Sequence, residues 1–135
     1  MTVIVDASVL VSALVDSGKE GRWAEETLLG QPTAAPELVM AETATVLRRL
    51  ERARLISHSE SNSAYRDLMR FNIELFAFSP FAERIWSLRE NLTIYDAWYV
   101  ALAEALNSPF LQRLTQGSSA PVGHVAGSFH PPELA

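Results

Sequence analysis

A short apolar run that ends in an acidic residue most constrains the fold of this 135-residue chain. Val3, Ile4 and Val5 are consecutive β-branched residues, a pattern typical of a strand buried on both faces of a parallel sheet. Asp6 follows directly, and residues 7–15 carry apolar side chains at helical spacing before the turn sequence Asp-Ser-Gly. The chain is therefore expected to open with a buried strand, an acidic residue at its carboxyl end and a helix.

Helical and extended segments continue to alternate through residue 106. Pro36, the capping-box spacing from Ser57 to Glu60 and the pair Ser79-Pro80 each mark a helix start. We predict further helices over residues 21–29, 36–54, 58–71, 80–91 and 95–106, with extended segments at 31–36, 73–78 and 109–111. Strands separated by helices need crossover connections, so the pattern predicts an α/β fold whose small parallel sheet is covered on both faces.

The composition restricts both the chemistry and the compartment. There is no cysteine, which excludes disulfides, thiolate catalysis and cysteine-ligated zinc. The N-terminus lacks a basic region and carries Asp6 inside its first apolar stretch, so it predicts neither a signal peptide nor a membrane span, and we expect a cytoplasmic protein. A net charge of −5 argues against passive adhesion to nucleic acid.

One basic cluster stands apart from this acidic background. It comprises Arg48, Arg49, Arg52 and Arg54, near the end of a predicted helix. These arginines either face solvent at the helix end, where positive charge suits the dipole, or line a groove that binds RNA phosphates.

Three carboxylates are candidates for the chemistry. Asp6 lies where polar sites collect in open α/β sheets, although it is also a suitable N-cap for the helix that follows. Asp96 has the spacing of a capping box headed by Thr93. Glu42 lies inside a predicted helix beside an apolar stripe, where a carboxylate requires solvent or a partner. The stripe comprises Leu38, Ala41, Thr45 and Val46.

A shared pocket for these carboxylates would need a cation, because like charges repel. Oxygen-only ligation selects Mg²⁺ or Mn²⁺. Such an ion supports in-line phosphoryl transfer, which indicates a metal-dependent nuclease or phosphatase. A phosphatase that uses Asp6 as its nucleophile usually has a second aspartate two residues later, where this chain has Ser8.

Three ordered segments resemble the motifs of a PIN domain, and more narrowly those of the VapC toxins of bacterial type II toxin–antitoxin modules. They are VIVDASVLV at 3–11, PELVMAETATVLRR at 36–49 and LTIYDAWYVALA at 92–103. The resemblance implies a Rossmann-like α/β/α sandwich formed by one domain over residues 1–135. It also implies an endoribonuclease that depends on Mg²⁺ or Mn²⁺ and cleaves structured RNA, such as tRNA or rRNA, with metal-activated water. A homodimer and inhibition by a cognate VapB-type antitoxin are implied as well.

Residue roles carry over from the same motifs. By resemblance, Asp6 and Asp96 are metal ligands, Glu42 supports the attacking water, and Ser8 orients Asp6. The candidates for RNA binding are Arg48, Arg49 and Arg52.

The end of the chain departs from the family pattern. VapC toxins usually have a fourth acidic residue, which would fall near Leu114, but no aspartate occurs after Asp96. Residues 107–135 also hold four of the seven prolines and three of the six glycines, so we regard them as an atypical tail, folded or partly disordered. We hypothesise that the gene is frameshifted near Phe110. The missing acid predicts weakened catalysis or, alternatively, a degenerate PIN domain that only binds its antitoxin.

Overall fold

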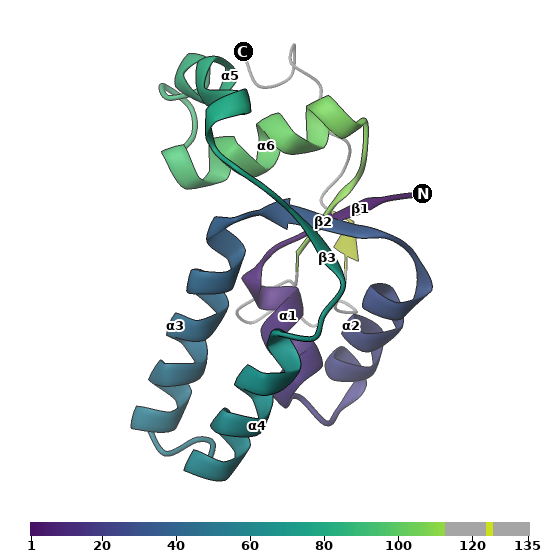
Figure 1. Ribbon diagram of the computed structural model, residues 1–135, viewed down its shortest axis with the longest axis vertical. Helices are drawn as coiled ribbons and strands as arrows, with labels where there is room; N and C mark the ends of the chain where they lie inside the picture. The colour runs from purple at the N-terminus through teal and green to yellow at the C-terminus, as the bar shows by residue number, and fades with distance from the viewer. Residues whose placement is uncertain (113–123, 126–135) are drawn as a thin grey trace.

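The structure, a computed structural model, describes residues 1–112 and 124–125 (Figure 1). Within these residues, five short strands form one sheet in the order β3-β2-β1-β4-β5. The strands are β1 (Val3–Val5), β2 (Thr33–Pro36), β3 (Ile73–Phe76), β4 (Phe110–Gln112) and β5 (His124–Val125). The first four strands are parallel, and β5 pairs antiparallel with β4. The predicted α/β fold with a small, mainly parallel sheet is confirmed.

Helices cover both faces of this sheet, with α1 to α4 on one side and α5 and α6 on the other (Figure 1). They are α1 (Ala7–Val15), α2 (Lys19–Gly30), α3 (Leu38–Arg52), α4 (His58–Leu68), the 3₁₀ helix η1 (Ser79–Phe81), α5 (Ala82–Ser87) and α6 (Ile94–Leu106). Val3 and Val5 pack in the cluster formed with α1 to α4, whereas Ile4 packs with Leu102 of α6. Successive residues of β1 point to opposite faces and all are buried, which explains the uninterrupted β-branched run.

The α6 side is held by apolar burial and by one ion pair. Ile4 and Leu102 are completely buried, and burial of a side chain of this size contributes about 1.5–3 kcal/mol. Arg84 in α5 donates from Nε and Nη2 to the two carboxylate oxygens of Glu104 in α6, at 2.7 and 2.8 Å. A helix as short as α5 is not stable by itself, so this two-point contact helps to fix it against α6.

Several predicted boundaries are wrong because tertiary pairing and packing override local signals. The helix predicted to begin at Pro36 begins two residues later, since Pro36 pairs with Phe76 in the sheet and the Glu37 amide donates to the Phe76 carbonyl at 2.9 Å. The helix predicted over 80–91 is divided into η1 and α5 and ends at Ser87. Leu88 lies just beyond this end and is buried in the cluster that includes α6. The helix expected to reach residue 71 ends at 68, and the strand expected to reach 78 ends at 76.

The last described segments belong to the sheet. The strand predicted at 109–111 is β4, displaced by one residue, whereas β5 is not foreseen by the sequence pattern. Residues 113–123 and 126–135 lie outside the described residues, and so does the position near Leu114 where a fourth acidic residue is expected. The frameshift hypothesis also concerns this part of the chain and is tested by sequencing the gene. No helix in the described ranges is long and apolar enough to cross a membrane.

Candidate active site

Asp6 lies at the carboxyl end of β1, the strand between β2 and β4. Ligands of open α/β sheets bind outside the carboxyl ends of the strands, at the point where the strand order reverses. The Oδ1 atom of Asp6 accepts hydrogen bonds from the amides of Ser8 at 3.0 Å and Val9 at 3.3 Å, and the Ser8 hydroxyl donates to the same atom. Asp6 is therefore the N-cap of α1. Within the described residues its other oxygen, Oδ2, accepts no hydrogen bond and is free to act as a ligand.

Glu42 has the partner that its position requires. It lies half-buried in the second turn of α3, and its Oε1 atom accepts a hydrogen bond from the Tyr99 hydroxyl of α6 at 2.7 Å. The Tyr99 side chain is buried, and its ring stacks on Phe110 of β4 with 5.1 Å between centroids and 9° between planes. The sheet thus fixes the phenol, and the phenol in turn fixes the Glu42 carboxylate.

Asp96 lies in the first turn of α6, and its side chain is exposed. The Asp96 amide donates to the Thr93 hydroxyl oxygen at 3.1 Å, so Thr93 is the N-cap as predicted. Within residues 1–112, the Asp96 carboxylate itself has neither a hydrogen bond nor an ion pair, so only one of the two hydrogen bonds of a capping box forms at Thr93. In α4, by contrast, Ser57 and Glu60 form both hydrogen bonds of a capping box. Sequence reasoning missed Tyr99, although a residue three positions after Asp96 lies on the same face of the helix.

The charges of the three carboxylates act on the buried phenol of Tyr99. Burial is the largest cause that raises the pKa of the Tyr99 phenol, followed by its hydrogen bond to Glu42 and by the negative charges of Glu42, Asp6 and Asp96. Burial also raises the pKa of Asp6, and Glu42 adds to this effect, while the hydrogen bonds at the start of α1 oppose it. Acidic residues from three separate motifs therefore lie near enough to the Tyr99 phenol for their charges to act on it.

The donor chemistry of this cluster fits a hard divalent cation. The ion pairs found in the described part of the chain involve Glu51, Asp67 and Glu104, so none of its basic residues neutralises the cluster. No group of three or more His, Asp or Glu side chains in the described ranges is arranged to hold a metal ion. Mg²⁺, however, usually binds through one or two carboxylates and keeps several waters. Asp6 and Asp96 supply oxygen donors of the required kind.

An open groove of about 370 Å³ lies between α3 and the start of α6, and Glu42 is part of its wall. The apolar stripe beside Glu42 lines this groove, and its first residue, Leu38, also packs against the core cluster that includes α6. The stripe residues are Leu38, Ala41, Thr45 and Val46. The buried face of α3 consists of Val39, Thr43 and Leu47. Glu42 therefore has access to solvent as well as a hydrogen-bond partner.

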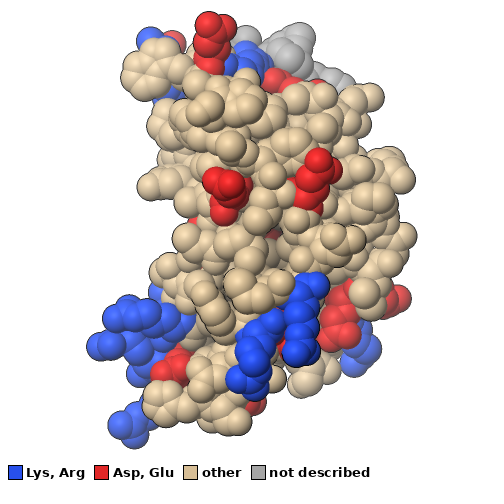
Figure 2. Space-filling view, viewed as in Figure 1, with Lys and Arg blue, Asp and Glu red and all other residues tan. Residues whose placement is uncertain are grey.

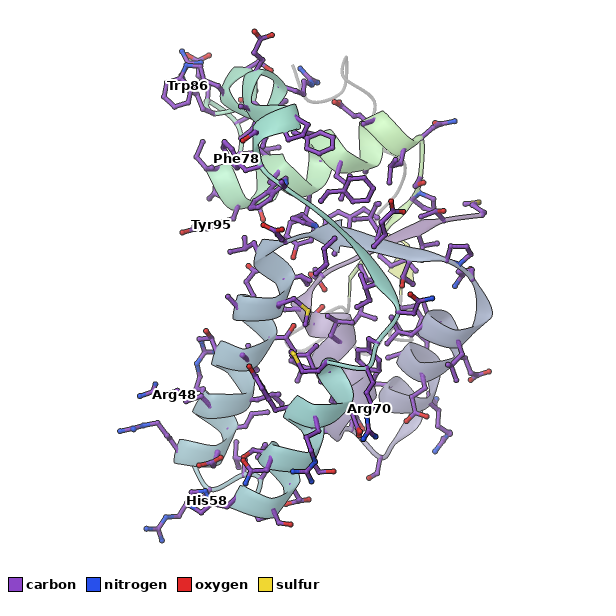
Figure 3. All side chains as sticks on the ribbon, viewed as in Figure 1. Arg48, His58, Arg70, Phe78, Trp86 and Tyr95 are labelled. Atoms are coloured by element: carbon purple, nitrogen blue, oxygen red, sulfur yellow. The ribbon has the colours of Figure 1, made fainter. Side chains whose placement is uncertain are left out.

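The structure divides the arginine cluster. Arg49 lines the groove, whereas Arg52 and Arg54 line a different pocket at the turn between α3 and α4. Arg48 points outward from α3 in Figure 3. Most of the Lys and Arg surface on the face shown in Figure 2 lies over α3 and α4. Of the three arginines predicted to bind RNA, Arg49 is the one that shares a groove with a candidate carboxylate.

Known proteins match both the sequence and the fold. The PIN domain family matches residues 3–113. Ribonuclease VapC9 of Mycobacterium tuberculosis is 36% identical over 105 residues, which cover 78% of this chain and 80% of VapC9. The structure of M. tuberculosis VapC20, a sarcin–ricin loop cleaving toxin, has a TM-score of 0.60 at 15% identity and covers 86% of this chain and 91% of VapC20. A chain of Rickettsia felis VapBC2 bound to a promoter DNA fragment has a TM-score of 0.57 at 16% identity. The match covers 82% of this chain and 86% of the VapBC2 chain.

The parallel sheet, the acidic cluster at its carboxyl end and the match over residues 3–113 define one class of protein. The chain belongs to the PIN-domain family, and its similarity to VapC9 places it among the VapC ribonucleases.

The raised pKa of Asp6 predicts that Asp6→Asn is more stable than the wild type at neutral pH. Below the ordinary pKa of 3.8 the Asp6 carboxyl is neutral in both the folded and the unfolded chain, so its ionisation has no effect on the free energy of unfolding. As the pH rises through 3.8, the unfolded chain loses its proton before the folded chain does, so the wild type loses stability until the pH exceeds the raised folded pKa. Asn preserves the N-cap without this charge. Urea unfolding across this pH range measures the difference, and a difference independent of pH would contradict the prediction.

Proposed function

We propose that the chain is a Mg²⁺- or Mn²⁺-dependent endoribonuclease and the toxin of a VapBC module. The observation that carries the proposal is the placement of Asp6 at the carboxyl end of β1, of Glu42 on the Tyr99 hydroxyl, and of Asp96 one helical turn before Tyr99 in α6. Similarity to ribonuclease VapC9 supports RNA as the substrate class. We propose structured RNA, such as tRNA or rRNA, as the target.

Each residue of the cluster has a distinct role in this proposal. Asp6 and Asp96 are the metal ligands, and the metal, when bound, lowers the pKa of water and stabilises charge on the leaving oxygen. Glu42 positions the attacking water and accepts its proton. Tyr99 holds the Glu42 carboxylate through the 2.7 Å hydrogen bond, and Ser8 holds Asp6 in the same way. Tyr99 and Ser8 are therefore positioning residues.

The proposal includes a VapB-type antitoxin as protein partner, a homodimer and a cytoplasmic location. The VapBC2 assembly of R. felis, whose fold this chain shares, supports the antitoxin. Phe78 and Trp86 are 39% and 61% exposed and project from the same end of the molecule in Figure 3, which supports an interface between protein chains. Light scattering on the chain alone and with a co-expressed antitoxin measures both assemblies.

Removal of divalent cations with EDTA is expected to abolish RNA cleavage. Mg²⁺ is expected to raise the unfolding temperature, because a ligand of the folded state at 100 times its Kd stabilises by about 2.7 kcal/mol. Asp96→Asn is expected to lose both RNA cleavage and the rise in unfolding temperature with Mg²⁺. The variant is expected to remain folded, since α6 is capped by the Thr93 side chain. Thermal unfolding with and without Mg²⁺ provides a readout besides activity. Cleavage that persists in EDTA would contradict metal dependence.

A second candidate function is that of a degenerate PIN domain that binds its antitoxin without cleaving RNA. The specific observation in its favour is the absence of any aspartate after Asp96. Inducible expression in a bacterial host separates the two candidates. Growth arrest that requires Asp6 and is relieved by a co-expressed antitoxin indicates a working toxin. A folded chain that causes no arrest but co-purifies with the antitoxin indicates the degenerate domain.

A further inference from the structure

Tyr95 is an exposed aromatic residue beside the carboxylates, and the proposed mechanism does not use it. Its side chain is 60% exposed, and it lies outside the core clusters formed by the described residues. Ala97 and Trp98, which follow in the same helix, are buried. Figure 3 shows Tyr95 projecting outward next to the start of α3. Core packing therefore does not account for this ring.

The open groove connects Tyr95 with Glu42 and Arg49. Arg49 follows Glu42 by seven positions in α3, which corresponds to about 10 Å at roughly 1.5 Å per residue. That length accommodates about three stacked nucleotides at roughly 3.4 Å each. The groove thus has an acidic side chain near the proposed reaction centre and a cationic side chain about 10 Å further along α3.

The groove offers two kinds of contact that a nucleic acid strand needs. The Arg49 guanidinium has the fork of donors that matches phosphate oxygens. The exposed Tyr95 ring offers a flat apolar surface of the kind on which bases stack. The remaining wall is apolar or small, at Leu38, Ala41 and Val46, and presents no further charge to the strand. This combination favours RNA over an acidic or a wholly apolar peptide.

We propose that Tyr95 stacks on a base of the RNA strand whose backbone phosphate is bound by Arg49. The two residues hold the nucleotides next to the scissile phosphate. Base–aromatic stacking tolerates any base, so this subsite positions RNA without selecting a sequence. The inference rests on the proposed ribonuclease function.

The test compares two fluorescent strands of equal charge and of about twelve units. One is oligoadenylate RNA and the other is the abasic ribose-phosphate strand. Binding is measured by fluorescence anisotropy in Ca²⁺, which neutralises the carboxylates, and the RNA is checked for integrity on a gel. The wild type is expected to prefer oligoadenylate.

Tyr95→Ala is expected to bind oligoadenylate about tenfold more weakly and to lose the preference for it over the abasic strand. Tyr95→Phe is expected to bind like the wild type, because the ring remains. Arg49→Gln is expected to weaken the binding of both strands equally. It is also expected to reduce the slope of log K against log salt concentration by about one. A structural role of Tyr95 would not distinguish the two strands.

Matched controls remove the same side-chain types elsewhere. Tyr65→Ala removes a tyrosine that is 50% exposed on α4, and Arg22→Gln removes an exposed arginine on α2. Both side chains lie outside the groove, and both variants are expected to bind like the wild type.

The outcomes separate the subsite from the ribonuclease proposal. The stacking subsite alone is overturned if Tyr95→Ala binds oligoadenylate like the wild type. It is also overturned if Tyr95→Phe loses as much affinity as Tyr95→Ala. A wild type that binds neither strand overturns the stacking subsite, whereas the ribonuclease proposal is decided separately by cleavage of structured RNA with and without EDTA. If Tyr95→Ala binds RNA like the wild type but no longer co-purifies with a co-expressed antitoxin, the groove binds the protein partner. That result also overturns the stacking subsite.

Discussion

Asp6→Asn is expected to lower RNA cleavage by more than about 100-fold while the protein stays folded. The two side chains have the same shape, and Asn is as good an N-cap as Asp, so the amides of Ser8 and Val9 keep their acceptor. The substitution removes only the negative charge proposed to hold the metal. Loss of an outer hydrogen-bond partner of a metal ligand already costs roughly 10–100-fold, and loss of a ligand costs at least as much. The measurement is kcat/KM with saturating Mg²⁺.

Asp16→Asn is the matched control for this charge change. Asp16 lies at the other end of α1, where its Oδ1 atom accepts a hydrogen bond from the Gly18 amide at 2.7 Å. It takes no part in the carboxylate cluster, so wild-type cleavage is expected. Wild-type cleavage by Asp6→Asn would contradict its proposed role. Equal losses in both variants would indicate a general effect of charge.

Gly21→Ala is expected to destabilise the fold by about 1–3 kcal/mol. Helix propensity alone predicts the opposite sign, a gain of about 0.8–1.0 kcal/mol. A Cβ atom at Gly21 would lie 1.7 Å from the carbonyl oxygen of Asp16 and 3.0 Å from that of Ser12. Both oxygens belong to the backbone around the end of α1, so relief of the clash requires α1 to shift against α2. Urea unfolding measures the change in midpoint.

Gly30→Ala tests the same substitution where space is open. Gly30 is the last residue of α2, and a Cβ atom there meets nothing within 4 Å. A gain of about 0.4–1 kcal/mol is expected, because alanine restricts the unfolded chain. Destabilisation of both variants by similar amounts would contradict the packing explanation for Gly21.

Local interactions made much of the fold and part of the site predictable. The β-branched run of β1 predicted a buried strand, and the spacing from Ser57 to Glu60 predicted a capping box that the structure contains. Asp6 could be assigned to a strand end because the strand, the acid and the helix are adjacent in the chain. The Pro36 signal failed because the sheet partner at Phe76 is forty residues away.

By itself, the sequence determined where acidic residues follow strands and where most helices lie, because capping, helical periodicity and β-branching act between near neighbours. Only the tertiary structure decided that Glu42 is held by Tyr99, a residue 57 positions away. It also decided that Arg49, and not Arg48 or Arg52, shares the groove with Glu42. These outcomes depend on how α3 and α6 are rotated about their axes. Packing of the whole core sets that rotation, and no local pattern contains it.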